Sequence, residues 1–339
     1  MPIQGKKPSA QQIEQIYQLL EDSSSKKVII GLNKLRQHKL DYKIISYLVG
    51  MSWFYPDTKI RRRIKHLIFK EVSDDYASFL KGKWRYLPTP TLPKVWNLIE
   101  EVVKHPQIDA GIIRQWAYRE HLTNPELKLN NLKLQYLSSE LATFKHLKVL
   151  DLANNHLLTL PPEFGKLKKL ETLFLAHNQI AVLPTEIRKL KSLKKLDLSA
   201  NQGMNNLPSD LSNWAKLIWL DLSYNSFKTL PLGICNLPKL KELNIAHNQI
   251  KQLPKAAKQL KKLKKLNWSA NELPALPIES LLLLENLTTL DISDNLLEEL
   301  PLKLKKLPCL KQITIHNIPA LAKQRHQLKK NFAPIELIF

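Results

Sequence analysis

Apolar residues recur in the last two-thirds of the chain with one template, L-x-x-L-x-L-x-x-N. Seven consecutive copies match it, and their asparagines are spaced by 23 or 24 residues. These asparagines are Asn155, Asn178, Asn201, Asn225, Asn248, Asn271 and Asn295. A Leu-Pro pair follows each copy, first at Leu160 and Pro161. Self-similarity at a period of this length is typical of repeat proteins, so the pattern predicts a stack of similar coils.

Each copy of the template predicts a short strand followed by a turn. The side chains of L-x-L alternate, so the leucines face the interior and the residues between them face outward. The asparagine comes where the chain leaves the strand, and its amide can bond backbone groups of the turn and of the next coil. The Leu-Pro pair ends the extended segment and starts an irregular or helical return. One coil cannot bury its leucines alone, so the coils are expected to share one continuous core.

Weaker copies of the template flank the seven. Upstream, Leu127 and Leu129 fit the strand, but Leu132 replaces the asparagine, and downstream Ile318 replaces it. Atypical end coils are expected because they must cap the core. The apolar tail, residues 334–339, is predicted to form a last strand that closes the open end.

The template and its Leu-Pro-x-x-Ile return resemble the intracellular 23-residue leucine-rich repeats. Repeats of this type occur in Ras-pathway scaffold proteins, in plant intracellular relatives and in many bacterial cytosolic proteins. The resemblance covers residues 122–339. It implies an α/β solenoid, a leucine-rich-repeat horseshoe with a parallel sheet on its concave face, and a protein partner bound on that face. No kinase, GTPase, TIR or ligase segment accompanies the repeats.

Residues 1–121 lack the template and show helical periodicity, which predicts an all-α domain before the repeat domain, residues 122–339. The expected helices cover residues 10–20, 26–40, 42–49, 58–72, 75–81, 92–104 and 109–119. The run from Asp57 to Arg61 resembles the Asp…Val-Arg element of HEAT-type helical repeats, which implies stacked helix pairs. Another helical bundle fits the periodicity equally well.

Composition adds a strong positive charge. The chain has 52 Lys and Arg residues against 30 Asp and Glu residues, a formal net charge of +22. This balance favours an anionic partner, such as nucleic acid, lipid headgroups or an acidic protein surface. Cys235 and Cys309 are expected to be small buried side chains and not a disulfide. No apolar run is long enough to span a membrane and no signal-peptide core is present, so we expect a cytoplasmic protein.

Aromatic residues at outward positions are the first candidates for a binding site. A coil needs no large ring facing solvent, and such rings are typical anchors of protein interfaces. The candidate contact residues on the concave face are Phe174, His177, Lys195, Trp219, Tyr224, Glu242 and His247. Aspartates also recur at one outward position, from Asp151 to Asp291, and we interpret them as support for the local backbone.

Basic clusters are the second candidates. Lysines recur just before each strand, so stacking is expected to align them along one edge of the solenoid. Another cluster lies on the helix expected over residues 58–72. The favoured interpretation is a solvated surface, and the alternative is binding of nucleic acid or another polyanion. The residues concerned are Arg61, Arg62, Arg63, Lys65, Lys261, Lys262, Lys264 and Lys265.

The sequence contains no pattern for catalysis. It has 8 glycines, and it lacks a glycine-rich phosphate loop, an H-E-x-x-H motif and paired C-x-x-C motifs. His177 and His247 belong to coils three apart, about 15 Å, which is too far to share a metal ion. We therefore expect no enzymatic activity, metal, cofactor or small-molecule substrate. The sequence favours a protein-binding scaffold, with polyanion binding as the alternative.

Overall fold

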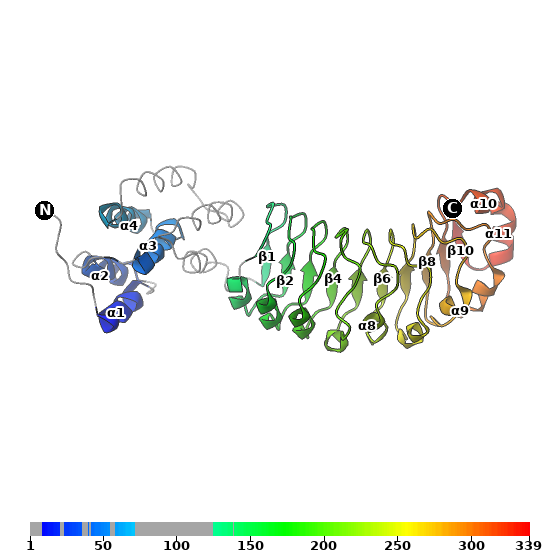
Figure 1. Cartoon of the computed structure of the whole chain (residues 1–339), viewed down its shortest axis with the longest axis horizontal. Coiled ribbons are helices and arrows are strands. Elements are labelled where there is room, and N and C mark those ends of the chain that lie inside the picture. Colours follow the sequence, from blue (N-terminus) through cyan, green and yellow to red (C-terminus); the bar gives the residue numbers. More distant parts are fainter. Residues whose placement is uncertain are drawn as a thin grey trace. The chain divides into compact units, whose positions relative to one another are not determined.

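The structure of the chain is a computed structural model that divides into two compact units, Met1–Leu122 and Thr123–Phe339. It describes residues 9–20, 24–35, 40, 42–54, 58–71, 125–137 and 139–339. Each unit is considered by itself (Figure 1).

The described part of the first unit is helical. Its helices are α1 (Ala10–Leu20), α2 (Ser25–Leu35), α3 (Tyr42–Phe54) and α4 (Thr58–Glu71). Ser9 caps α1: its hydroxyl accepts a bond from the Gln12 N–H at 3.2 Å, and the Gln12 side chain accepts one from the Ser9 N–H at 2.8 Å. Helix α1 packs on α2, and α3 packs on α4. In α4, Ile60, Ile64 and Ile68 share one buried face, as the periodicity predicts.

The predicted helices agree with these four at most of their ends, but the second was predicted to extend to Leu40, whereas α2 ends at Leu35. The sequence stops the third helix at Val49, before Gly50, but α3 continues to Phe54, and the Ser52 hydroxyl donates to the Val49 carbonyl at 2.7 Å. One glycine costs a helix only about 1 kcal/mol, and the burial of Met51 in the next turn offsets that cost. The helices expected over 75–81, 92–104 and 109–119 lie outside the described residues. The HEAT-type arrangement stays a prediction.

The second unit is a solenoid with one parallel sheet, in which each strand pairs with the next along the chain (Figure 1). Its strands are β1 (Glu126–Lys128), β2 (Val149–Asp151), β3 (Thr172–Phe174), β4 (Lys195–Asp197), β5 (Trp219–Asp221), β6 (Glu242–Asn244), β7 (Lys265–Asn267), β8 (Thr289–Asp291), β9 (Gln312–Thr314) and β10 (Glu336–Ile338). The register follows the template, since Leu150 pairs with Leu173 and Leu173 with Leu196. The predicted α/β solenoid with a parallel sheet is confirmed.

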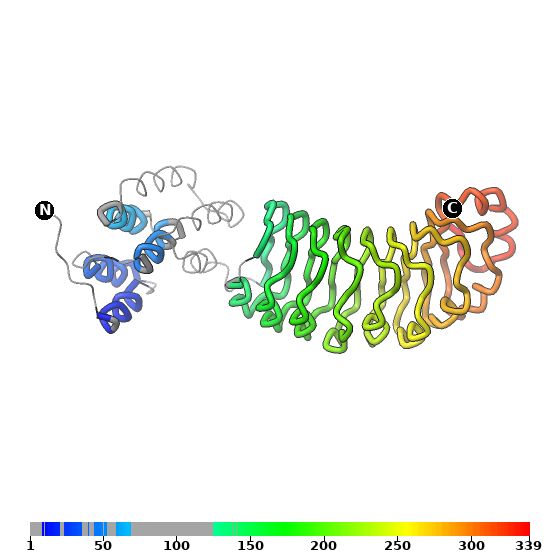
Figure 2. Tube along the Cα trace, viewed as in Figure 1, coloured from blue at the N-terminus to red at the C-terminus, as the bar shows by residue number. Residues whose placement is uncertain are grey.

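Short helical turns return the chain to the next strand, as the tube in Figure 2 shows coil after coil. They are η1 (Ser139–Thr143), η2 (Pro162–Lys166), η3 (Thr185–Lys189), η4 (Ser212–Trp214), α8 (Leu232–Cys235), η5 (Lys255–Gln259), α9 (Ile278–Leu281) and η6 (Leu302–Lys306). The prolines of the Leu-Pro pairs start most of them. Pro161 and Pro184 are extended, with φ near −60°, and each precedes a 3-10 turn.

The core of the solenoid is a set of stacked leucine columns. The inward residues that directly follow the strands, Leu152, Leu175, Leu198 and Leu222, are all fully buried, as predicted. The same column continues through Ile245 to Trp268, whose ring is also fully buried. The Trp268 Nε1 donates to the Ile250 carbonyl at 2.8 Å, so this larger side chain leaves no unpaired polar atom.

The template asparagines form a ladder between coils. The side-chain oxygen of Asn248 (Oδ1) accepts a hydrogen bond from the Phe227 N–H at 3.0 Å. The side-chain nitrogen (Nδ2) donates to the backbone carbonyls of Leu222 and Ile245. Each ladder residue follows a residue with positive φ, such as His177 at 54° or Ala200 at 52°. The left-handed residue turns the chain away from the strand and directs the next amide inward.

The last coil is closed by three elements. Helices α10 (Pro319–Lys323) and α11 (Arg325–Phe332) follow Ile318, and β10 then pairs in parallel with β9. Leu328 and Phe332 of α11 are buried, and α11 packs on η6 and on β10. The predicted closing strand is therefore confirmed, and helices precede it.

Both cysteines are free thiols. Cys235 is buried, as expected, and burial raises the pKa of its thiol to about 11. Cys309 is only half-buried.

Candidate functional site

Four of the predicted contact residues lie at outward positions of neighbouring strands. Phe174 ends β3, and Lys195, Trp219 and Glu242 begin β4, β5 and β6. The outward residues of β3 and β5 are half-buried on either side of a fully buried leucine. Lys195 and Trp219 are adjacent partners in the sheet, and Trp219 is in turn adjacent to Glu242.

The other three predicted residues lie in the turns that follow the strands. His177, Tyr224 and His247 all have positive φ, between 51° and 56°, and directly precede a ladder asparagine. The Tyr224 and His247 rings stack, with centroids 3.9 Å apart and 12° between their planes. Tyr224 is 54% exposed. The candidate residues therefore form two rows, one on the strands and one along the turns.

The recurring aspartates support the local backbone, in agreement with our interpretation of the sequence. The Asp197 carboxylate accepts bonds from the Ser199 N–H at 3.0 Å and from the Ser199 hydroxyl at 2.7 Å. The Asp151 and Asp291 carboxylates likewise accept a bond from the backbone N–H two residues later, and asparagines accept the same bond at the ends of β6 and β7. This side chain fixes the turn that leaves each strand.

Phe174 is the exception in this column. It occupies the position that holds an aspartate or asparagine in β2 and in β4 through β8. A phenyl ring cannot accept a bond from the backbone N–H two residues later, so this coil lacks the cap that its neighbours have. The ring is half-buried and faces outward from the sheet.

The pKa values of the Asp221 and Asp210 carboxyls are shifted in opposite directions. Burial raises the pKa of the Asp221 carboxyl, and hydrogen bonds from Ser212 lower the pKa of the Asp210 carboxyl. We expect a carbon-13 titration of the side-chain carboxyls to place Asp221 above, and Asp210 below, the usual range near 4.

The effects of the two carboxyls on stability have opposite signs. Folding favours protonated Asp221, so its contribution to stability falls as the pH rises from its unfolded pKa through its folded pKa. Asp210 contributes stability above its unfolded pKa and loses it as the pH falls through its folded pKa. Equal midpoints for the two carboxyls would contradict this assignment.

The predicted lysine edge is partly neutralised. Lys261 pairs with Glu285 at 3.3 Å, and Lys265 pairs with Glu242 at 3.1 Å. Lys262 and Lys264 form no ion pair among the residues that the structure describes. Burial and the charges of neighbouring lysines lower the pKa of Lys168 on the same edge, which is a sign of crowded positive charge.

The basic cluster of the first unit lies on α4. Arg62 and Arg63 are exposed, and Arg61 and Lys65 are half-buried. Burial, and then the charge of Arg61, lower the pKa of Lys65. Arg62 and Arg63 are therefore more accessible to an anion than Arg61 and Lys65.

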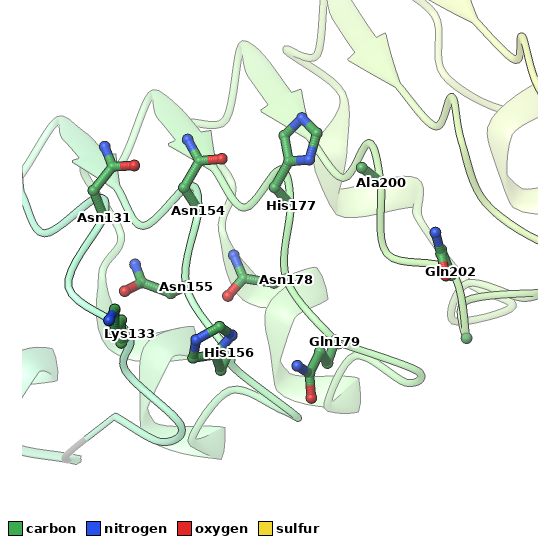
Figure 3. Close-up of a pocket in the computed structure, with 11 residues that line it drawn as sticks. Asn131, Lys133, Asn154, Asn155, His156, His177, Asn178, Gln179, Ala200 and Gln202 are labelled. Carbon is green, nitrogen blue, oxygen red and sulfur yellow. The ribbon is translucent and has the colours of Figure 1, made fainter.

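Sequence reasoning missed a polar hollow of about 620 Å³ over the turns of the first four coils. Figure 3 shows the ladder residues Asn155 and Asn178 between two rows of side chains. The upper row holds Asn131, Asn154 and His177, and the lower row holds Lys133, His156 and Gln179, with Gln202 at the equivalent position of the next coil. The members of each row come from successive coils. In the sequence, each upper-row residue directly precedes the ladder position of its coil, and each lower-row residue directly follows it. The signal in the sequence is this pair of polar columns beside the ladder.

The described residues contain no group of three or more His, Cys, Asp or Glu side chains arranged to hold a metal ion. None of their helices has the length and apolar character needed to cross a membrane.

Comparisons with known proteins agree with this architecture. Sequence models of leucine-rich repeats match residues 145–202 and 286–307, and a two-copy model matches residues 215–258. No curated protein sequence matches the chain.

Two solved structures are similar in fold. The leucine-rich-repeat domain of the type III effector XopL is 22% identical, with a TM-score of 0.50, and the match covers 79% of this chain and 96% of that domain. Internalin C2 of Listeria monocytogenes is 24% identical, with a TM-score of 0.50, and the match covers 67% and 93%. The matched repeat families support a general role in protein interaction. The chain therefore contains leucine-rich repeats, which form its solenoid, and a helical region precedes them in the sequence.

Proposed function

We propose that the chain is a scaffold that binds a partner protein on the concave, outward face of its sheet. The contact would centre on Phe174 and Trp219 and include Lys195 and Glu242. The turn residues His177, Tyr224 and His247 would border it. We also propose a cytoplasmic location, which fits two free thiols in the solenoid.

The observation that carries this proposal is the identity of residue 174. The adjacent coils place a turn-capping aspartate at this position, and a hydrogen bond of that kind contributes about 1 kcal/mol. The phenylalanine gives up that bond and directs an apolar ring away from the core. Coil stability does not explain this choice, whereas a contact with a partner does.

Trp219 supports the same surface. It is half-buried in β5, where the neighbouring strands have lysine and glutamate. Half-buried tryptophans bordered by charges of both signs are typical of the centre of protein interfaces. Phosphate groups would instead favour lysine and arginine alone. The aspartates at the ends of β4 and β5 also disfavour a polyanion on this face.

Polyanion binding remains a second candidate function, and its site would be the lysine edge. The charges of Lys189 and Lys191 beside Lys168 support it, as do Lys262 and Lys264, which form no ion pair with the residues that the structure describes. Binding to phosphates would weaken steeply as salt is added, whereas an interface anchored by aromatic rings would change less.

A single substitution should separate binding from stability at residue 174. We expect Phe174→Asp to leave the free energy of unfolding unchanged or to raise it by about 1 kcal/mol, because the aspartate restores the missing cap. The same change should weaken partner capture at least about tenfold, because it removes an anchor ring. The measurements are urea unfolding and quantitative capture from a lysate.

Thr314→Asp is the matched control, because Thr314 ends β9 at the equivalent position. It introduces the same side chain at the opposite end of the sheet and should leave partner capture unchanged. The proposal fails if both variants retain the same partners at full strength, or if both lose them equally.

A further inference from the structure

The polar hollow of Figure 3 is separate from the partner-binding surface and shares only His177 with it. Its volume of about 620 Å³ falls within the range of small-molecule sites, about 300–1,000 Å³. The hollow extends along the turns because Ala200 and Gly203, at its far end, contribute little or no side chain.

Two lining residues, Asn155 and Asn178, belong to the ladder and bond the backbone through their side chains. The side chains of Asn154, His156 and Gln179 are exposed and form no hydrogen bond with the residues that the structure describes, whereas some of their equivalents in later coils are paired. At the upper-row position, Asn317 bonds to Asp294 at 2.9 Å. At the lower-row position, Glu272 pairs with Lys251. The first four coils therefore present exposed hydrogen-bonding groups at positions that are paired within the protein in at least two later coils.

The chemistry of the lining selects a class of ligand. Amides and neutral imidazoles both donate and accept hydrogen bonds, as hydroxyl groups do. The lining has no carboxylate and a single cation, Lys133, so a polyanion or a polycation gains little there. It also lacks large apolar side chains, which an extended peptide would need for its own side chains.

We propose that this hollow binds a neutral, linear oligosaccharide that runs along the coils. Successive coils are about 5 Å apart, so each presents its pair of polar side chains to successive sugar rings. Sugar hydroxyls bridge the two rows, and the small side chains of Ala200 and Gly203 leave room for the last ring.

The test uses cellotetraose, chitotetraose and maltotetraose as probes of the full chain at millimolar concentration. We expect saturation transfer to at least one of them, with amide shift changes at Gln179 and Gln202. The triple variant His156→Ala, Gln179→Ala, Gln202→Ala should weaken that binding at least about tenfold.

Two further variants locate the site. The control Gln249→Ala, Glu272→Ala removes side chains from the same column in later coils and should keep full affinity. Gly203→Leu should block the hollow without disturbing the coil, because a Cβ there meets only Ala181, at 3.4 Å. Absence of saturation transfer to all three sugars overturns the proposal, as does equal loss of binding in the control. Shift changes in the hollow caused only by a peptide or an oligonucleotide overturn it too.

Discussion

Replacing Trp268 with alanine is expected to lower the free energy of unfolding of the solenoid by about 3–5 kcal/mol. The indole lies in the column of inward residues that directly follow the strands, and it is fully buried. Removing it leaves a cavity between β6 and β8, since no other coil has so large a side chain at this position. It also leaves the Ile250 carbonyl without its indole donor. Urea unfolding followed by circular dichroism measures the loss.

Trp219→Ala is the matched control, since it deletes the same side chain from the outward face of β5. We expect it to cost about 1 kcal/mol or less, because the ring is half-buried and its loss opens no internal cavity. Similar losses of free energy for the two variants would show that the contribution of Trp268 to stability does not come from its packing in the core.

The second large effect concerns the asparagine ladder. We expect Asn248→Ala to cost about 2–3 kcal/mol, because it leaves the buried Phe227 N–H without an acceptor. It also removes the amide that joins the Leu222 and Ile245 carbonyls of adjacent coils. The measurement is again the free energy of unfolding in urea, and the protection of the Phe227 amide in hydrogen exchange should fall with it.

Gln249→Ala provides the comparison for this variant. Gln249 is the next residue along the chain, and its side chain is exposed. Its removal should change stability by no more than about 0.5 kcal/mol. A ladder that contributes only local turn geometry would instead give Asn248→Ala and Gln249→Ala similar, small costs.

Most of the solenoid could be predicted because its template repeats. The alternation of Leu150 and Leu152 predicts a strand, and the fixed step to Leu173 predicts its register. The exact form of each return could not be predicted. Both 3-10 turns and short α-helices follow a Leu-Pro start, so this pair of residues does not distinguish between them. The end of α3 was missed because burial of Met51 outweighs the weak helix preference of Gly50.

The candidate site was only partly visible in the sequence. The template places Phe174 and Trp219 correctly on the strands, because outward positions follow from alternation. It does not reveal that Tyr224 and His247 adopt positive φ and stack in the turns. The missing cap at Phe174 becomes meaningful only once the hydrogen bonds of its neighbours are known.

The asparagine ladder also has a consequence for how such a chain can change in length. Each ladder asparagine bonds its own coil and the coil before it, and the strands pair only with their immediate neighbours. A duplication or deletion of one complete coil, such as residues 226–248, therefore preserves the ladder bonds and the strand pairing at the new junction. Such an event would move the outward ring of Trp219 relative to the end of the stack by one strand spacing, about 5 Å. Recombination can thus adjust the separation of two surface features without altering the residues that form either of them.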